Sequence, residues 1–206
     1  MEDGAGMVYR NILNVKRIVG VAGVVLAVAV VVAATAWLEN PMHLYDTDEW
    51  PDESQFRSTD SVKGVLNISA LVKVTDRPPP PGDGAGDWYS IIYDIKITNA
   101  SGKPVRGLVV GVKLDPVMKP WILSHMLDFG TGQSGIDLMP GKEPFGVYVS
   151  RVSGVPNPDT LEESDRTRLI EAIRTPLWLK ITWNGQSHYI RLDPEEIQYE
   201  GLSLLE

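Results

Sequence analysis

The chain has 206 residues, a formal net charge of −8 and no cysteine. The missing cysteines exclude disulfides, thiolate metal sites, cysteine-held iron–sulfur clusters and cysteine nucleophiles. The acidic excess repels nucleic acid and anionic lipid headgroups, so we expect no nucleic-acid partner, and instead neutral, cationic or protein partners.

An uncharged apolar run dominates the N-terminal part of the chain. It extends from Ile18 to Leu38, 21 residues without Asp, Glu, Lys or Arg. At a rise of about 1.5 Å per residue, a helix of this length spans roughly 30 Å, the hydrocarbon thickness of a bilayer. The run predicts a single transmembrane helix over residues 18–38, in contact with membrane lipid, after a short tail over residues 1–17.

The charges around this run predict its orientation. Arg10, Lys16 and Arg17 precede it, whereas the residues that follow it are acidic. Because Lys and Arg flanks remain in the cytoplasm, we expect a cytoplasmic N-terminus and an extracytoplasmic C-terminal domain at the cell membrane. A cleaved signal peptide ending at Ala36 is the alternative, but the apolar run is longer than the ~7–15 residues of a usual signal core.

Residues 39–61 are acidic and contain two prolines and few aliphatic residues. This composition predicts a solvated tether. A cation site over residues 46–53 is a weaker alternative, because the carboxylates lack the glycine-bearing pattern of a calcium loop.

Residues 62–206 show the period-two alternation of half-buried strands. Strands are expected over residues 65–75, 89–97, 105–114, 136–139, 177–183 and 187–192, with a Pro-rich loop over residues 77–87. A further strand is expected from Phe145, through Val147 and Val149, until Asn157-Pro158-Asp159 stops it. A helix is expected over residues 159–174, capped by Asp159 or Thr160. Asn184-Gly185 predicts a two-residue hairpin. We therefore expect a mainly β fold, an immunoglobulin-like antiparallel β-sandwich with one inserted helix.

The stretch from Tyr93 to Asp115, followed by Leu138-Met-Pro-Gly141 and Phe145, resembles the FxLYD-like and related small immunoglobulin-like domains of bacterial and archaeal envelope proteins. The chain departs from that pattern at residues 116–126, where the family has a tight Asp-Gly turn, and in its additional helix. The resemblance implies an extracytoplasmic binding or structural module and transfers no catalytic residue.

Few residues have the spacing of a catalytic or metal site. His43, His125 and His188 are far apart, so no metal-ligand spacing exists. Ser124, His125 and Asp128 together suggest a catalytic triad, but three neighbours on one short segment seldom converge. The loop Gly130–Gly135 lacks the lysine of a phosphate-binding loop. We expect no enzymatic activity, no metal and no cofactor.

Trp121 and His125 are the candidate partner-binding residues, because Trp121 lies on an irregular segment where an aromatic anchor could be exposed. The alternative for Trp121 is a plug at one end of the sandwich. Asn67 and Asn99 match glycan acceptor motifs. The sequence predicts a non-catalytic, membrane-anchored interaction module that binds protein or envelope components; the alternative is an accessory or structural subunit of a larger membrane complex or surface assembly.

Overall fold

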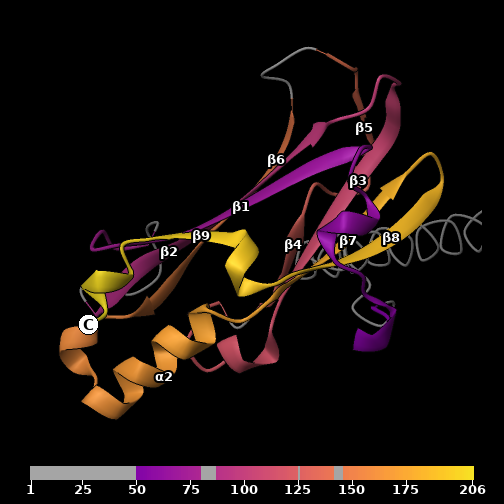
Figure 1. Ribbon diagram of the computed structural model, residues 1–206. Helices are drawn as coiled ribbons and strands as arrows, with labels where there is room; N and C mark the ends of the chain where they lie inside the picture. The colour runs from indigo at the N-terminus through magenta and orange to yellow at the C-terminus, as the bar shows by residue number, and fades with distance from the viewer. Residues whose placement is uncertain (1–49, 80–86, 125, 142–145) are drawn as a thin grey trace, which may run out of the picture. The chain divides into compact units, whose positions relative to one another are not determined.

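The computed structural model describes residues 50–79, 87–124, 126–141 and 146–206. Within these ranges it is mainly β, with nine strands in two sheets and one α-helix (Figure 1). The predicted tail, transmembrane segment and first part of the tether lie outside the described residues. None of the helices in the described ranges is long and apolar enough to cross a bilayer.

The first sheet has four strands in the order β6-β2-β1-β9. β1 (Leu66–Thr75), β2 (Trp88–Asn99) and β6 (Gly146–Pro156) run antiparallel in unbroken register, as their alternation predicts. β6 ends at Pro156, directly before the predicted stop at Asn157-Pro158-Asp159. β9 (Ile197–Glu200) completes the sheet beside β1.

The second sheet has five strands. Its main order is β4-β3-β7-β8, and β5 also pairs with β3. The strands are β3 (Val105–Leu114), β4 (Asp128–Gly130), β5 (Ile136–Leu138), β7 (Leu177–Trp183) and β8 (Gln186–Leu192). The predicted Asn184-Gly185 turn between β7 and β8 is confirmed, because both residues have positive φ, 50° and 77°.

The core lies between the two sheets, which form a sandwich. Alternate residues of each long strand are buried in one continuous cluster, as the period-two pattern predicts. The central strands of both sheets contribute its largest fully buried side chains, including Tyr93, Ile95, Leu108 and Leu179.

The helix begins later than predicted. α2 covers Glu163–Ile173, and its N-cap is Glu162, without a side-chain cap. The proposed caps Asp159 and Thr160 lie instead in a 3-10 turn, Pro158–Thr160, whose cap is Asn157. The prediction was wrong here because Asn157-Pro158 starts its own turn before the chain reaches the helix. Leu169, Ala172 and Ile173 bury the apolar face of α2 at one end of the sandwich (Figure 1).

The C-terminal segment departs from the expected antiparallel arrangement. After the 3-10 turn Pro194–Glu196, β9 pairs with β1 in parallel, with Val72 opposite Tyr199. The alternation in the sequence predicts no strand after residue 192. The four residues of β9 are too few to show an alternation, and the pairing depends on contacts with a strand more than a hundred residues earlier.

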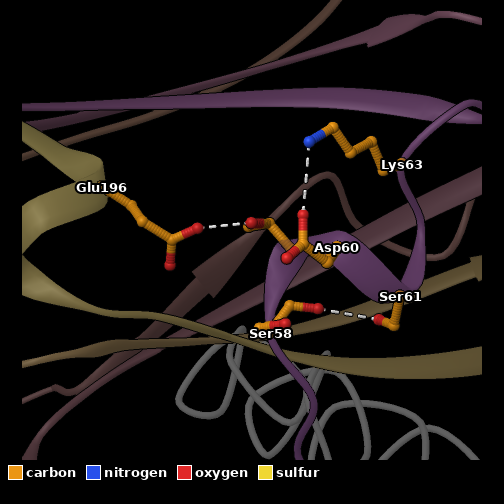
Figure 2. A network of polar contacts seen from close by, with 6 residues as sticks. Ser58, Asp60, Ser61, Lys63 and Glu196 are labelled. Carbon is orange, nitrogen blue, oxygen red and sulfur yellow. Dashed lines mark hydrogen bonds and ion pairs between the residues drawn. The ribbon is translucent and has the colours of Figure 1, made fainter.

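Residues 50–61, the end of the predicted solvated tether, pack on the domain. They form two 3-10 turns, Glu53–Gln55 and Thr59–Ser61. The ring of Phe56 lies against Trp178 and Tyr189 on the outer face of the five-stranded sheet. The Thr59 hydroxyl donates to the Glu196 carboxylate, so the entering chain is also joined to the turn before β9 (Figure 2). The ring of Phe56 and the hydroxyl of Thr59 thus join this segment to the domain, although its average composition is that of a spacer.

Candidate functional site

The outward face of the four-stranded sheet carries an unusual mixture of side chains. Directly opposite residues of neighbouring strands share a face, so the strand registers define rows across it. One row joins Ser69, Lys96 and Tyr148, and the next joins Gln198, Leu71, Asp94 and Ser150. A third row joins Glu200, Lys73, Ile92 and Val152. The outward face of this sheet therefore mixes polar, charged and apolar side chains on one continuous surface.

A shallow groove of ≈ 370 Å³ crosses the first two rows. Leu71 and Lys96 line it together with the oxygen-bearing residues Ser69, Ser150 and Asp94. Tyr148 is 61% exposed at its margin. The Lys96 ammonium lies 5.7 Å from the centre of the Tyr148 ring, a cation–π contact that holds the ring over the sheet.

One ion pair lies on this face. Lys73 Nζ lies 3.1 Å from Glu200 Oε2, and the two side chains are 44% and 41% exposed. The surface therefore offers an exposed tyrosine, aliphatic contacts and both hydrogen-bond donors and acceptors, without a strong charge of one sign. Such a composition suits contact with a protein, since exposed tyrosine is enriched where proteins bind one another.

Sequence reasoning missed this surface because it followed the buried face of each strand. The signal was nevertheless present in the alternation. Leu71 and Ile92 occupy outward positions of β1 and β2, where a sheet facing only water would carry polar residues. Tyr148 and Val152 occupy the outward positions of β6.

The predicted triad segment has another role in the structure. Arg151 Nη2 donates to Ser124 Oγ at 2.5 Å, and Arg151 Nη1 donates to the Asp128 carbonyl oxygen at 3.0 Å. Ser124 Oγ also lies 3.5 Å from Ser153 Oγ. A guanidinium does not deprotonate in proteins, so it cannot act as the base for this serine. The contacts fasten the segment before β4 to β6. His125 lies outside the described residues.

Burial shifts the ionisation of this cluster. Burial lowers the pKa of Arg151, and the electrostatic interactions with Tyr93 and Asp128 oppose this shift. Burial raises the pKa of the Asp128 carboxyl, against Lys113 and Arg151. Burial also raises the pKa of Tyr93 far above its usual value, and the hydroxyl of this residue has no hydrogen-bond partner among the described residues. Arg151 and Tyr93 are directly opposite in β6 and β2, so both side chains face the core.

Trp121 is partly buried and packs against the core, next to the fully buried Ile122. This position fits the end-plug alternative, and partner binding by Trp121 stays a prediction. His188 stacks on Trp183, with ring centroids 3.7 Å apart, and its Nε2 is buried without a hydrogen-bond partner in the ranges that the structure describes. Burial lowers the pKa of His188. The described ranges contain no group of three His, Asp or Glu side chains that could hold a metal.

The two glycan acceptor motifs differ in their surroundings. Asn99 Nδ2, the atom that would carry a glycan, donates to the carbonyl oxygens of Lys103 and Leu138. Asn99 Oδ1 accepts from the backbone N–H and the hydroxyl of Ser101. Asn67 lies exposed at the start of β1. The Asn99 side chain therefore ties the β2–β3 turn together.

Comparison with known proteins gives little more than this geometry. No known family and no curated protein matches the chain. Among solved structures, the crystal structure of the ligand binding region of Serine-glutamate repeat protein A (SgrA) of Enterococcus faecium is similar over 66% of this chain and 98% of that chain. The sequence identity is 14% and the TM-score is 0.26. The FxLYD-like resemblance stays a prediction.

Proposed function

We propose that this chain is a single-pass membrane protein whose immunoglobulin-like C-terminal domain is a non-catalytic interaction module outside the cell. The apolar run from Ile18 to Leu38 supports the anchor, because its length matches a bilayer. The basic residues before it and the acidic residues after it support the orientation.

The groove on the four-stranded sheet is the observation that supports an interaction function. Its partner is a protein in this proposal. Tyr148 supplies a large ring whose position is held by Lys96, so little side-chain freedom is lost when a partner covers it. Asp94 and Ser150 in the adjacent row can select hydrogen-bond donors on that partner.

Topology and anchoring are tested first. Protease added to intact cells should remove the region after Glu39, and the mature protein should begin at or near Met1 and need detergent for extraction. Protection of the C-terminal region, with cleavage confined to the first 17 residues, would reverse the proposed orientation. An N-terminal sequence beginning at Trp37 would establish cleavage and remove the anchor.

Binding is tested by placing a photo-crosslinking amino acid at Leu71, within the groove, in the full chain. The control position is Met139, which is 59% exposed beside the other sheet. We expect a protein adduct at position 71 that Tyr148→Ala weakens and Val117→Ala leaves unchanged. Equal labelling at both positions, or insensitivity to Tyr148→Ala, would remove the groove as the binding surface.

Purification in mild detergent separates this proposal from the alternative. A lone species supports a module that binds its partner transiently. A stable complex with other chains supports the accessory-subunit function.

A further inference from the structure

The backbone edge of β6 is a second feature of this sheet and adjoins the groove, which Tyr148 and Ser150 also line. The Leu123 backbone N–H donates to the Gly154 carbonyl at 3.0 Å, so the backbone groups of Gly154 point away from β2. Alternate residues of a strand direct their N–H and C=O to the same side. The backbone groups of Val152, Ser150 and Tyr148 therefore also point away from β2.

The opposite strand confirms this direction. Ser90 lies directly across from Gly154, and its N–H donates to the Arg77 carbonyl at 2.9 Å, away from β6. The β2–β6 register continues without a shift to Gly146. Tyr148, Ser150 and Val152 are all exposed, and no hydrogen bond among the described residues uses their outward backbone groups. Three N–H and three C=O groups in one row therefore have no hydrogen-bond partner within the described part of the chain.

The other sheet edges are covered or short. Arg57 pairs with β8, donating to the Tyr189 carbonyl and accepting from Arg191 N–H at 2.9 and 2.8 Å. β9 has four residues, and β4 and β5 have three each. Open edges are usually guarded by charge or proline, but Tyr148, Ser150 and Val152 are uncharged, and Arg151 between them is turned toward the core. Along the described strands, β6 is thus the long edge open to pairing.

We propose that this edge pairs with β6 of a second copy of the chain, antiparallel about a two-fold axis at Ser150. This register places Tyr148 opposite Val152 of the second copy, twice, and Ser150 opposite its own equivalent. Aromatic and β-branched residues form favourable cross-strand pairs, and no like charges meet along the seam. If the second strand is moved by two residues in one direction, Val152 lies opposite Gly146, which has no side chain to pack. A shift the other way requires Gly154, whose carbonyl already binds Leu123.

The inference rests on the proposed function, because it names one protein partner of the same sheet. Three residues a side make a small interface. Membrane anchoring would compensate, since confinement of two copies to one membrane raises their effective concentration. The two four-stranded sheets would join edge to edge, leaving both grooves uncovered.

The absence of native cysteine allows a direct test in the full chain in its membrane. Ser150→Cys creates a single thiol, and two thiols facing each other across the axis, with Cα atoms about 5.5 Å apart, are within reach of a disulfide. A mild oxidant accepts the two electrons, and two protons are released. Ser69→Cys, exposed on the same sheet two strands from the edge, is the control.

We expect the covalent dimer of Ser150→Cys to form about tenfold faster or more than that of Ser69→Cys, because pairing raises the local thiol concentration. A mixture of Tyr148→Cys and Val152→Cys chains should cross-link, whereas neither variant alone should. Equal rates at positions 150 and 69 would overturn the proposal. An adduct of Ser150→Cys with a different protein, replacing the dimer, would also overturn it while leaving the proposed interaction function standing. A disulfide-linked dimer at position 150, together with no protein adduct in the photo-crosslinking experiment at position 71, would support the pairing. It would remove only the groove as a binding surface.

Discussion

The ring of Phe56 meets the indole of Trp178 edge-on, with ring centroids 4.8 Å apart and ring planes at 72°. Arg191 covers the same indole at 5.4 Å. The contact joins the segment that enters the domain to the central part of the five-stranded sheet. It turns a stretch of polar, acidic composition into part of the folded unit.

Phe56→Ala should therefore destabilise the domain. We expect a loss of about 1–2 kcal/mol, less than the ~3–5 kcal/mol of a fully buried phenylalanine, because Phe56 remains partly exposed. Urea unfolding of the detergent-solubilised chain, followed by tryptophan fluorescence, measures the change. Val117→Ala, at a side chain that is 47% exposed, is the control and should have little effect. Equal stability of Phe56→Ala and the parent chain would mean that the segment is not docked.

Gly185→Val tests the hairpin between β7 and β8. Positive φ at Gly185 is costly for a β-branched residue, so we expect a loss of roughly 1–3 kcal/mol. Gly102→Val is the matched control, since Gly102 has no positive φ and open space around its Cβ direction. The difference between the two urea midpoints is the measurement. An unchanged midpoint in Gly185→Val would contradict the β7–β8 register.

Asn99→Ala should weaken the turn between β2 and β3. The change removes the donor to the Leu138 carbonyl and the acceptor of the Ser101 N–H, and it leaves the Lys103 carbonyl with the Ser101 hydroxyl alone. We expect a loss of about 1–3 kcal/mol. Asn67→Ala is the control within the second acceptor motif, because the exposed Asn67 side chain has no hydrogen bond within the described ranges. If both variants unfold at the same urea concentration, the Asn99 contacts contribute nothing to stability.

His188 predicts a loss of stability in mild acid. Burial lowers the pKa of His188 below its usual 6.5, so the unfolded chain takes up a proton more readily than the folded one. Stability is then full above about pH 6.5 and falls as the pH decreases from there toward the folded-state pKa. His188→Phe keeps a ring against Trp183 and removes the titration. Urea midpoints between pH 7.5 and 5.5 should fall more steeply for the parent chain than for His188→Phe; parallel profiles would exclude His188 as the source.

The long strands could be predicted because each buries one face and exposes the other. Leu66, Ala70, Val72 and Val74 in β1 repeat with period two, and the structure buries them. The Asn184-Gly185 turn was equally readable, since few dipeptides adopt positive φ twice. In these places the information lies within ten or so neighbouring residues.

Other features depend on contacts distant in the sequence. Nothing near Ile197 marks it as a strand, because β9 exists only through its parallel pairing with β1. Arg151 has the chemistry of a surface residue, yet its register beside Tyr93 turns it inward. The candidate surface was missed for the same reason: Leu71 and Tyr148 are distant in sequence and share a groove only through the strand order β6-β2-β1.

The covering of β8 by Arg57 limits how the protein can assemble. A sheet that is open along both edges can add copies without end and grow into a fibre. Here the other edge of the β6 sheet is β9, which is short and offers little for a further copy to pair with. In the five-stranded sheet, Arg57 of the entering chain pairs with the edge strand β8. A pairing made through β6 of both copies is therefore closed: it uses the same edge twice and ends at two chains. Removal of the Phe56 contact would then have an effect beyond stability, because exposure of β8 would permit open-ended aggregation.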